Sequence, residues 1–279
     1  KIIQVWDDNL QVAFQEMENF ATFYQVIGVS TTFPGTIYSA PHGTWRNEYQ
    51  LIKSNVDSDM KLIQMSFTLS NGGMVKKTYE FNFSFDWEKD TGNQDSIEFL
   101  REGGINFEKH QQEGIQHDHF FWLFKYSDLL SKPLTWVSFQ GGYTYAYLWK
   151  YMKMCDLPEK EEGFMSFIRE EFAVNYDVKS MMSLCGVQGG GLKALCACLG
   201  VRCGNLAKAG QKSIVIMEAM ITIKKMIDKS TLIAHKNVIH PVWKEENPTN
   251  ASSARTADTE AVVPLFSEPC LRWGWKIRY

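Results

Sequence analysis

Three hydroxyl residues stand together at the end of a predicted strand. The run QVIGVST at residues 25–31 is apolar and β-branched, and it stops at the turn signal FPG at residues 33–35. Ser30, Thr31 and Thr32 therefore lie where a buried strand becomes a loop. Neutral hydroxyl oxygens can join the shell of a magnesium ion, although they do so alongside phosphates and a carboxylate. Three hydroxyl residues are unusual at such a strand end.

Asp177 is the first residue of a predicted helical segment at residues 177–185. An aspartate at this place is typical of an N-cap, whose carboxylate accepts hydrogen bonds from the first free N–H groups.

The cysteines have a structural interpretation. All six lie in the second half, and the spacing of Cys196, Cys198 and Cys203 is no standard zinc spacing, so we expect reduced thiols.

The surrounding elements follow from hydrophobic periodicity. An apolar stripe predicts a helix after residues 7–9. The runs 61–70 and 76–85 flank Asn71-Gly72-Gly73 and alternate, which predicts an antiparallel hairpin with one solvent-exposed face. One later strand is expected at 135–140, and helices are expected near 95–103, 118–130, 143–154, 163–171, 177–185, 191–199 and 211–228. The sequence therefore predicts an α/β domain with a mixed sheet covered by helices.

Composition limits the classes of function. The 279 residues are 44% apolar and carry a net charge of −3, so no global basic field favours non-specific duplex binding, although a local groove stays open. No apolar run reaches the roughly 18–20 residues of a membrane span, and we expect no membrane partner. Residues from 235 onward change character, with a stretch rich in Thr, Ser, Ala and Asn. We expect one domain at 1–234 and a divergent, partly flexible tail at 235–279.

Many ordered segments resemble one family, the Caf/Pop poly(A)-specific ribonucleases. These are deadenylase subunits of the carbon-catabolite-repression/Not complex, within the DEDD 3′-5′ exonuclease superfamily. The resemblance runs from about residue 5 to residue 228. Its segments are VWDDNL at 5–10, FPGT at 33–36, YQLIKSNVD at 49–57, KLIQMSFTLS at 61–70, EFNF at 80–83, DSIEFLREGGINFEKH at 95–110, WVSFQGGY at 136–143, NYDVKSMM at 175–182 and GGLKALCACLG at 190–200.

The resemblance implies a ribonuclease-H-like fold and a known chemistry. In that family four acids hold two Mg²⁺ ions, which activate a water and steady the leaving oxygen as adenylates leave the 3′ end of RNA. Two close dications repel each other unless anionic ligands surround them. The resemblance also implies partners, namely the large Not scaffold and the second, exonuclease–endonuclease–phosphatase-type deadenylase, and a location in nucleus and cytoplasm.

The departures from the family fall at the chemistry. Ser30 and Thr32 stand where the resemblance implies Asp and Glu, and Thr144 stands where it implies a second Tyr-Asp acid. Ala207 replaces a histidine that helps position the attacking water. Asp177 is the acid kept, and two interpretations of it stay open: a weak site for at most one magnesium ion, or an N-cap.

Two lysines near these positions, Lys208 and Lys212, stand where the family has polar or acidic residues. A lysine can contact an RNA phosphate or occupy an emptied cation position. The alternative is that both are solvent-exposed helix lysines.

These residues predict a catalytically impaired family subunit that acts mainly as an adaptor in mRNA deadenylation. One alternative is an active magnesium-dependent poly(A)-specific 3′-5′ exoribonuclease that shortens mRNA tails and contacts poly(A) RNA. A second is a decayed gene product without selected function.

Overall fold

Six strands form one mixed sheet in the computed structural model, which describes residues 1–39 and 48–240. The spatial order is β1-β4-β3-β2-β5-β6, and the pairs β1/β4, β2/β5 and β5/β6 are parallel, whereas β2/β3 and β3/β4 are antiparallel. The strands are β1 (Ile2–Val5), β2 (Val26–Thr32), β3 (Gln64–Ser70), β4 (Val75–Asn82), β5 (Thr135–Ser138) and β6 (Val174–Asp177). The predicted mixed sheet is confirmed.

The prediction of a single later strand was wrong, because β6 follows β5. A strand of four residues, VNYD, is too short to show a hydrophobic period, and Asp177 was predicted to begin a helix, whereas it ends this strand. The segment after it, η3 (Val178–Cys185), is a 3-10 helix. Residues 40–47 lie outside the described residues, and so does the part of the tail predicted at 235–279 that follows residue 240.

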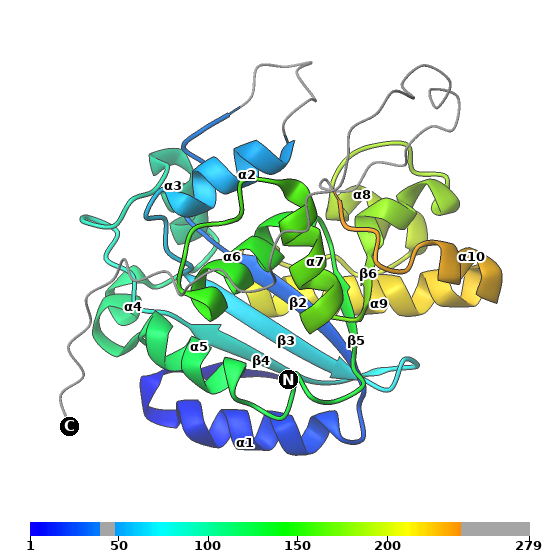
Figure 1. The fold of residues 1–279 in the computed structure, drawn as a ribbon, viewed down its shortest axis with the longest axis horizontal. Helices are drawn as coiled ribbons and strands as arrows, with labels where there is room; N and C mark the ends of the chain where they lie inside the picture. The colour runs from blue at the N-terminus through cyan, green and yellow to red at the C-terminus, as the bar shows by residue number, and fades with distance from the viewer. Residues whose placement is uncertain (40–47, 241–279) are drawn as a thin grey trace, which may run out of the picture.

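Helices cover both faces of the sheet (Figure 1). Helix α9 packs across β2, β3, β4 and β5 on one face, while α1 contacts β4 and α6 contacts β2 on the other. The remaining helices pack around these layers. Their bounds are η1 (Asp7–Asn9), α1 (Leu10–Ala21), α2 (Glu48–Asp57), α3 (Gln94–Glu102), α4 (Phe107–Glu113), α5 (His117–Lys125), α6 (Gly142–Lys153), α7 (Glu161–Glu171), α8 (Leu192–Leu199), α9 (Ala209–Met226) and α10 (Lys229–Ala234).

The apolar face of the hairpin is the centre of the main core. Phe67 on β3 and Phe81 on β4 are fully buried and meet at a ring-centroid distance of 5.8 Å. Phe14 of α1 and Phe120 of α5 pack onto Phe81, with centroids at 5.4 and 4.9 Å. Buried aromatic side chains of this size each contribute a large apolar area to the fold.

The other face of the hairpin is polar, but it is not exposed as the alternation predicted. It is buried beneath the first half of α9, and hydrogen bonds satisfy its side chains. Thr68 pairs with Thr78 Oγ1 at 2.9 Å and with Ser213 Oγ at 2.7 Å, and the Ser66 hydroxyl donates to Ala209 O at 2.6 Å. A covering helix lets a polar strand face leave water when each group finds a partner. We call this set the polar layer; its residues are Gln64, Ser66, Thr68, Thr78, Glu80, Asn82 and Ser213.

Among residues 1–39 and 48–240, no helix has both the length and the apolar character that crossing a membrane requires.

Candidate functional site

The hydroxyl triplet lies at the carboxyl end of β2, as predicted, and its side chains divide between the two faces of the sheet. Ser30 and Thr32 face α9, and the Thr32 hydroxyl donates to Ala207 O at 3.0 Å. Thr31 faces α6 and meets the Thr144 hydroxyl at an Oγ1–Oγ1 distance of 3.2 Å. All of these side chains are buried. The hydroxyls of Thr31, Thr32 and Thr144 therefore have protein partners.

Lys212 reaches the same strand end from the first turns of α9. Its Nζ donates to Thr31 O at 2.5 Å. Burial lowers the pKa of Lys212 to about 8, against the opposing effect of the nearby Glu80 carboxylate. The expectation of a solvent-exposed helix lysine therefore fails at this position, because the side chain runs inward to the sheet.

Lys208 takes a different course. It occupies the N-cap position of α9, and a Cβ added at Gly104 would lie 3.5 Å from its Nζ. Its ammonium therefore lies over the turn after α3, whereas that of Lys212 lies at the end of β2. The RNA contact expected of the two lysines stays a prediction.

Asp177 is completely buried, and its carboxylate accepts four backbone hydrogen bonds. Oδ1 accepts from Gln140 N and Lys179 N, both at 3.0 Å, and Oδ2 accepts from Gly141 N at 2.7 Å and His240 N at 3.1 Å. Burial raises the pKa of Asp177 to about 6, although the four N–H donors act to lower it. The N-cap interpretation is thus observed, since Lys179 belongs to the first turn of η3.

Asp177 also lies apart from the triplet. It ends β6, two strands from β2, which places the two backbones roughly 10 Å apart. The weak magnesium site predicted for it would have to displace some of the four N–H donors. In the described part of the chain, no group of three or more His, Cys, Asp or Glu side chains is arranged to hold a metal ion.

Ala207 is buried in a small apolar cluster with Ile97 and Leu100 of α3. The turn after α3 packs tightly against it, because a Cβ added at Gly103 would lie 2.3 Å from the Ala207 Cβ. The space around residue 207 is therefore filled by the fold.

Sequence reasoning missed two residues that fix the start of α9. Glu80 of β4 accepts from Gly210 N at 2.5 Å and from Gln4 Nε2 at 2.9 Å, and Gln64 Oε1 accepts from Ala209 N at 3.1 Å. Both side chains satisfy N–H groups that the first turn of a helix leaves unpaired. In the sequence these two residues appear only as polar residues at alternate positions of the hairpin, a pattern that a solvent-exposed face would also produce.

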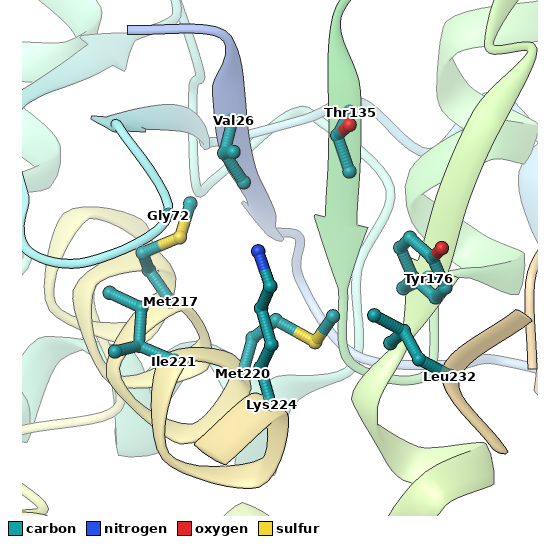
Figure 2. A pocket seen from close by; sticks show the side chains of 9 residues that line it. All are labelled: Val26, Gly72, Thr135, Tyr176, Met217, Met220, Ile221, Lys224 and Leu232. Carbon is teal, nitrogen blue, oxygen red and sulfur yellow. The ribbon is translucent and has the colours of Figure 1, made fainter. Parts of the chain in front are cut away.

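A separate pocket of about 140 Å³ lies at the opposite end of the strands (Figure 2). Val26 and Thr135, the first residues of β2 and β5, line it together with Tyr176, Met220 and Lys224. None of the predicted site residues lines this pocket.

Known proteins with the same architecture identify the fold. The chain superposes on the structure of S. pombe Pop2p in its Mg²⁺- and Mn²⁺-bound form with a TM-score of 0.78, at 30% identity, covering 86% of this chain and 98% of that one. It also superposes on CAF1 co-crystallised with the yeast NOT1 MIF4G domain, with a TM-score of 0.72 at 24% identity over 86% of this chain and 96% of that one. The protein therefore has the ribonuclease-H-like α/β fold of a nuclease domain.

Two curated relatives define the family. The chain is 34% identical to the probable CCR4-associated factor 1 homolog 7 of Arabidopsis thaliana over 231 residues, covering 77% of this chain and 83% of that protein. It is 36% identical to poly(A) ribonuclease pop2 of Schizosaccharomyces pombe over 190 residues, which covers 65% of this chain and 56% of the length of that relative. No protein-family model matches the chain. The chain belongs to the CCR4-associated factor 1/Pop2 family of the DEDD exonuclease superfamily.

Proposed function

We propose that this chain is a catalytically impaired member of its family that acts mainly as an adaptor in mRNA deadenylation. The observation that carries the proposal is the end of β2, where Ser30 and Thr32 present neutral hydroxyls on the α9 face and Thr31 presents one on the α6 face. Two Mg²⁺ ions held close together need several anionic oxygens around them. A site of hydroxyls cannot supply that charge.

The residues present do not fit the divalent metals bound by the solved relative. The Thr32 and Thr144 hydroxyls are bonded within the protein, and both oxygens of Asp177 already accept two N–H groups. A lysine ammonium stands at the same strand end and adds positive charge. A methyl group at Ala207 can accept no proton from an attacking water. These residues therefore support no metal-dependent hydrolytic step.

An adaptor role requires a folded surface and no chemistry. The described residues form a six-stranded sheet covered by helices, and a solved yeast neighbour, CAF1, was co-crystallised with the NOT1 MIF4G domain. We propose that this chain binds the corresponding Not scaffold and, through the complex, the second deadenylase, in nucleus and cytoplasm. In that place it would compete with active members of its family.

A deadenylation assay tests the loss of activity. Purified protein incubated with 5′-labelled oligo(A) RNA and Mg²⁺ should shorten it at least about 10⁴-fold more slowly than S. pombe pop2, since general-base catalysis alone contributes about 10²–10⁴. Denaturing gels at enzyme excess measure the shortening. A ladder of products within tenfold of the pop2 rate would establish the alternative, an active poly(A)-specific exoribonuclease.

A binding assay tests the adaptor role. Immobilised Not scaffold, limited to its MIF4G domain, should retain this protein with an affinity within about tenfold of that for an active family member, because the fold is kept. Calorimetric titration gives the dissociation constant. If a correctly folded protein shows no binding at micromolar concentration, the adaptor role is excluded and a product without selected function remains.

A further inference from the structure

The end of β2 opens a gap in the sheet. β2 pairs with β3 as far as Thr32, but with β5 only over Val26–Gly28. The Thr32 carbonyl points to the β3 side, where it accepts from Ile63 N at 2.9 Å. Successive carbonyls of a strand point to opposite edges, so Thr31 O points to the β5 side, beyond the last β2–β5 pair. Parallel strands that diverge at their carboxyl ends form the crevice in which α/β proteins bind ligands.

Lys212 supplies a hydrogen-bond donor at this gap. Its Nζ donates to Thr31 O at 2.5 Å, so the ammonium satisfies a carbonyl that β5 leaves unpaired. The Glu80 carboxylate is the charged group that favours this ammonium electrostatically. Thr32, whose hydroxyl donates to Ala207 O, lies on the same face of the strand as α9.

The position of this ammonium is fixed by the polar layer. The first turn of α9 is held by Gln64 at Ala209 N, by Glu80 at Gly210 N and by the Ser66 hydroxyl at Ala209 O. Lys212 follows within the same helix turn, so its stem starts from a rigid base. Solvent screens a partly buried ammonium less than it screens a surface lysine, so the Lys212 ammonium acts more strongly on other ions.

We infer that Lys212 is an internal cation that takes the place of a bound metal at the end of β2 and excludes divalent ions from this strand end. This inference rests on the proposed loss of activity and deepens it. The missing carboxylates remove attraction for a metal, and Lys212 adds repulsion of its own. A new carboxylate placed beside it would pair with the ammonium and would therefore attract a metal ion less strongly.

The test restores the acids with and without the lysine. The triple variant Ser30→Asp, Thr32→Glu, Thr144→Asp adds three negative charges, of which Lys212 offsets one, so its affinity for Mn²⁺ should stay below that of the same variant without the lysine. Adding Lys212→Gln to the triple variant should tighten Mn²⁺ binding at least about tenfold. Quenching of the free-Mn²⁺ signal in electron paramagnetic resonance measures binding without reference to activity.

Lys208 supplies the matched control, because it lies one helical turn earlier with its ammonium over Gly104. Adding Lys208→Gln to the triple variant should leave Mn²⁺ binding unchanged. The inference is overturned if the triple variant with Lys212 intact binds Mn²⁺ as tightly as the variant with Lys212→Gln. Tight Mn²⁺ binding by the unmodified protein would instead contradict the proposed loss of activity.

A less disruptive pair of variants guards against misfolding. Thr32→Glu alone loses the hydroxyl bond to Ala207 O, but it should melt higher than Thr32→Glu with Lys212→Gln, because the ammonium at Thr31 O can pair with the new carboxylate. The double variant should recover when Mn²⁺ is added. Equal melting temperatures for the two variants, with no response to Mn²⁺, would show that Lys212 is not the compensating cation.

Discussion

Replacing Asp177 by asparagine is expected to lower the free energy of unfolding by about 3 kcal/mol. The carboxylate accepts four backbone N–H groups from three separate segments of the chain: the residues before α6, the first turn of η3, and His240. An amide keeps one accepting oxygen and turns an NH₂ group toward two of the donors. Two buried N–H groups then lose their partner. Urea denaturation followed by far-ultraviolet circular dichroism measures the change.

Asp228→Asn is the matched control. Asp228 caps α10, with Oδ1 accepting from Thr231 N at 2.9 Å, and it is exposed. Asparagine is as good an N-cap as aspartate, so this variant should lose only a few tenths of a kcal/mol. If both variants lose the same small amount, the four hydrogen bonds of Asp177 do not stabilise the fold as we describe.

Stability is expected to fall as the pH falls from 7 to 5, and His110 accounts for about 2 kcal/mol of the loss. Its imidazole is 1% exposed, with Nδ1 placed 2.7 Å from Phe83 O. Burial lowers the pKa of His110 to about 4, from about 6.5 in the unfolded chain. Between these values the unfolded state binds more protons, so acid favours unfolding, and the loss is complete below pH 4.

The variant His110→Asn isolates this contribution. The asparagine amide places a donor near the position of Nδ1 but does not titrate. Its free energy of unfolding should fall about 2 kcal/mol less than that of the unmodified protein between pH 7 and pH 5. His119→Asn, at an imidazole that is 43% exposed, should keep the full loss. Parallel pH dependence of the His110 variant and the unmodified protein would refute the assignment.

Periodicity and turn residues were enough to predict most elements of this fold. The apolar stripe of α1, the strand before residues 33–35 and the hairpin around residues 71–73 all lie where the pattern predicts them. The pattern failed where tertiary structure decides. The polar face of the hairpin looks the same in sequence whether water or α9 covers it, and α9 comes about 140 residues later. β6 is too short to show any period.

In the candidate site, too, the positions of residues followed from local sequence, whereas the direction of a side chain depended on tertiary structure. The strand end with Ser30 and Thr32 could be located from sequence, because a strand followed by a turn signal fixes its position. The direction of a long side chain could not. Lys212 points inward because the register of α9 on the sheet is set by Glu80 and Gln64, which precede it by more than 130 residues.

The polar layer also determines how α9 can move. An apolar interface loses little when a helix slides along it, because one methyl group replaces another, whereas hydrogen bonds are directional and short. A shift of one helical turn, about 5.4 Å, would break the bonds at Ala209, Gly210 and Ser213 together. The polar layer therefore allows a single register of α9 on the sheet. Any surface near α9 that this protein presents to a partner therefore keeps a fixed position relative to the sheet, whether or not a reaction takes place beneath it.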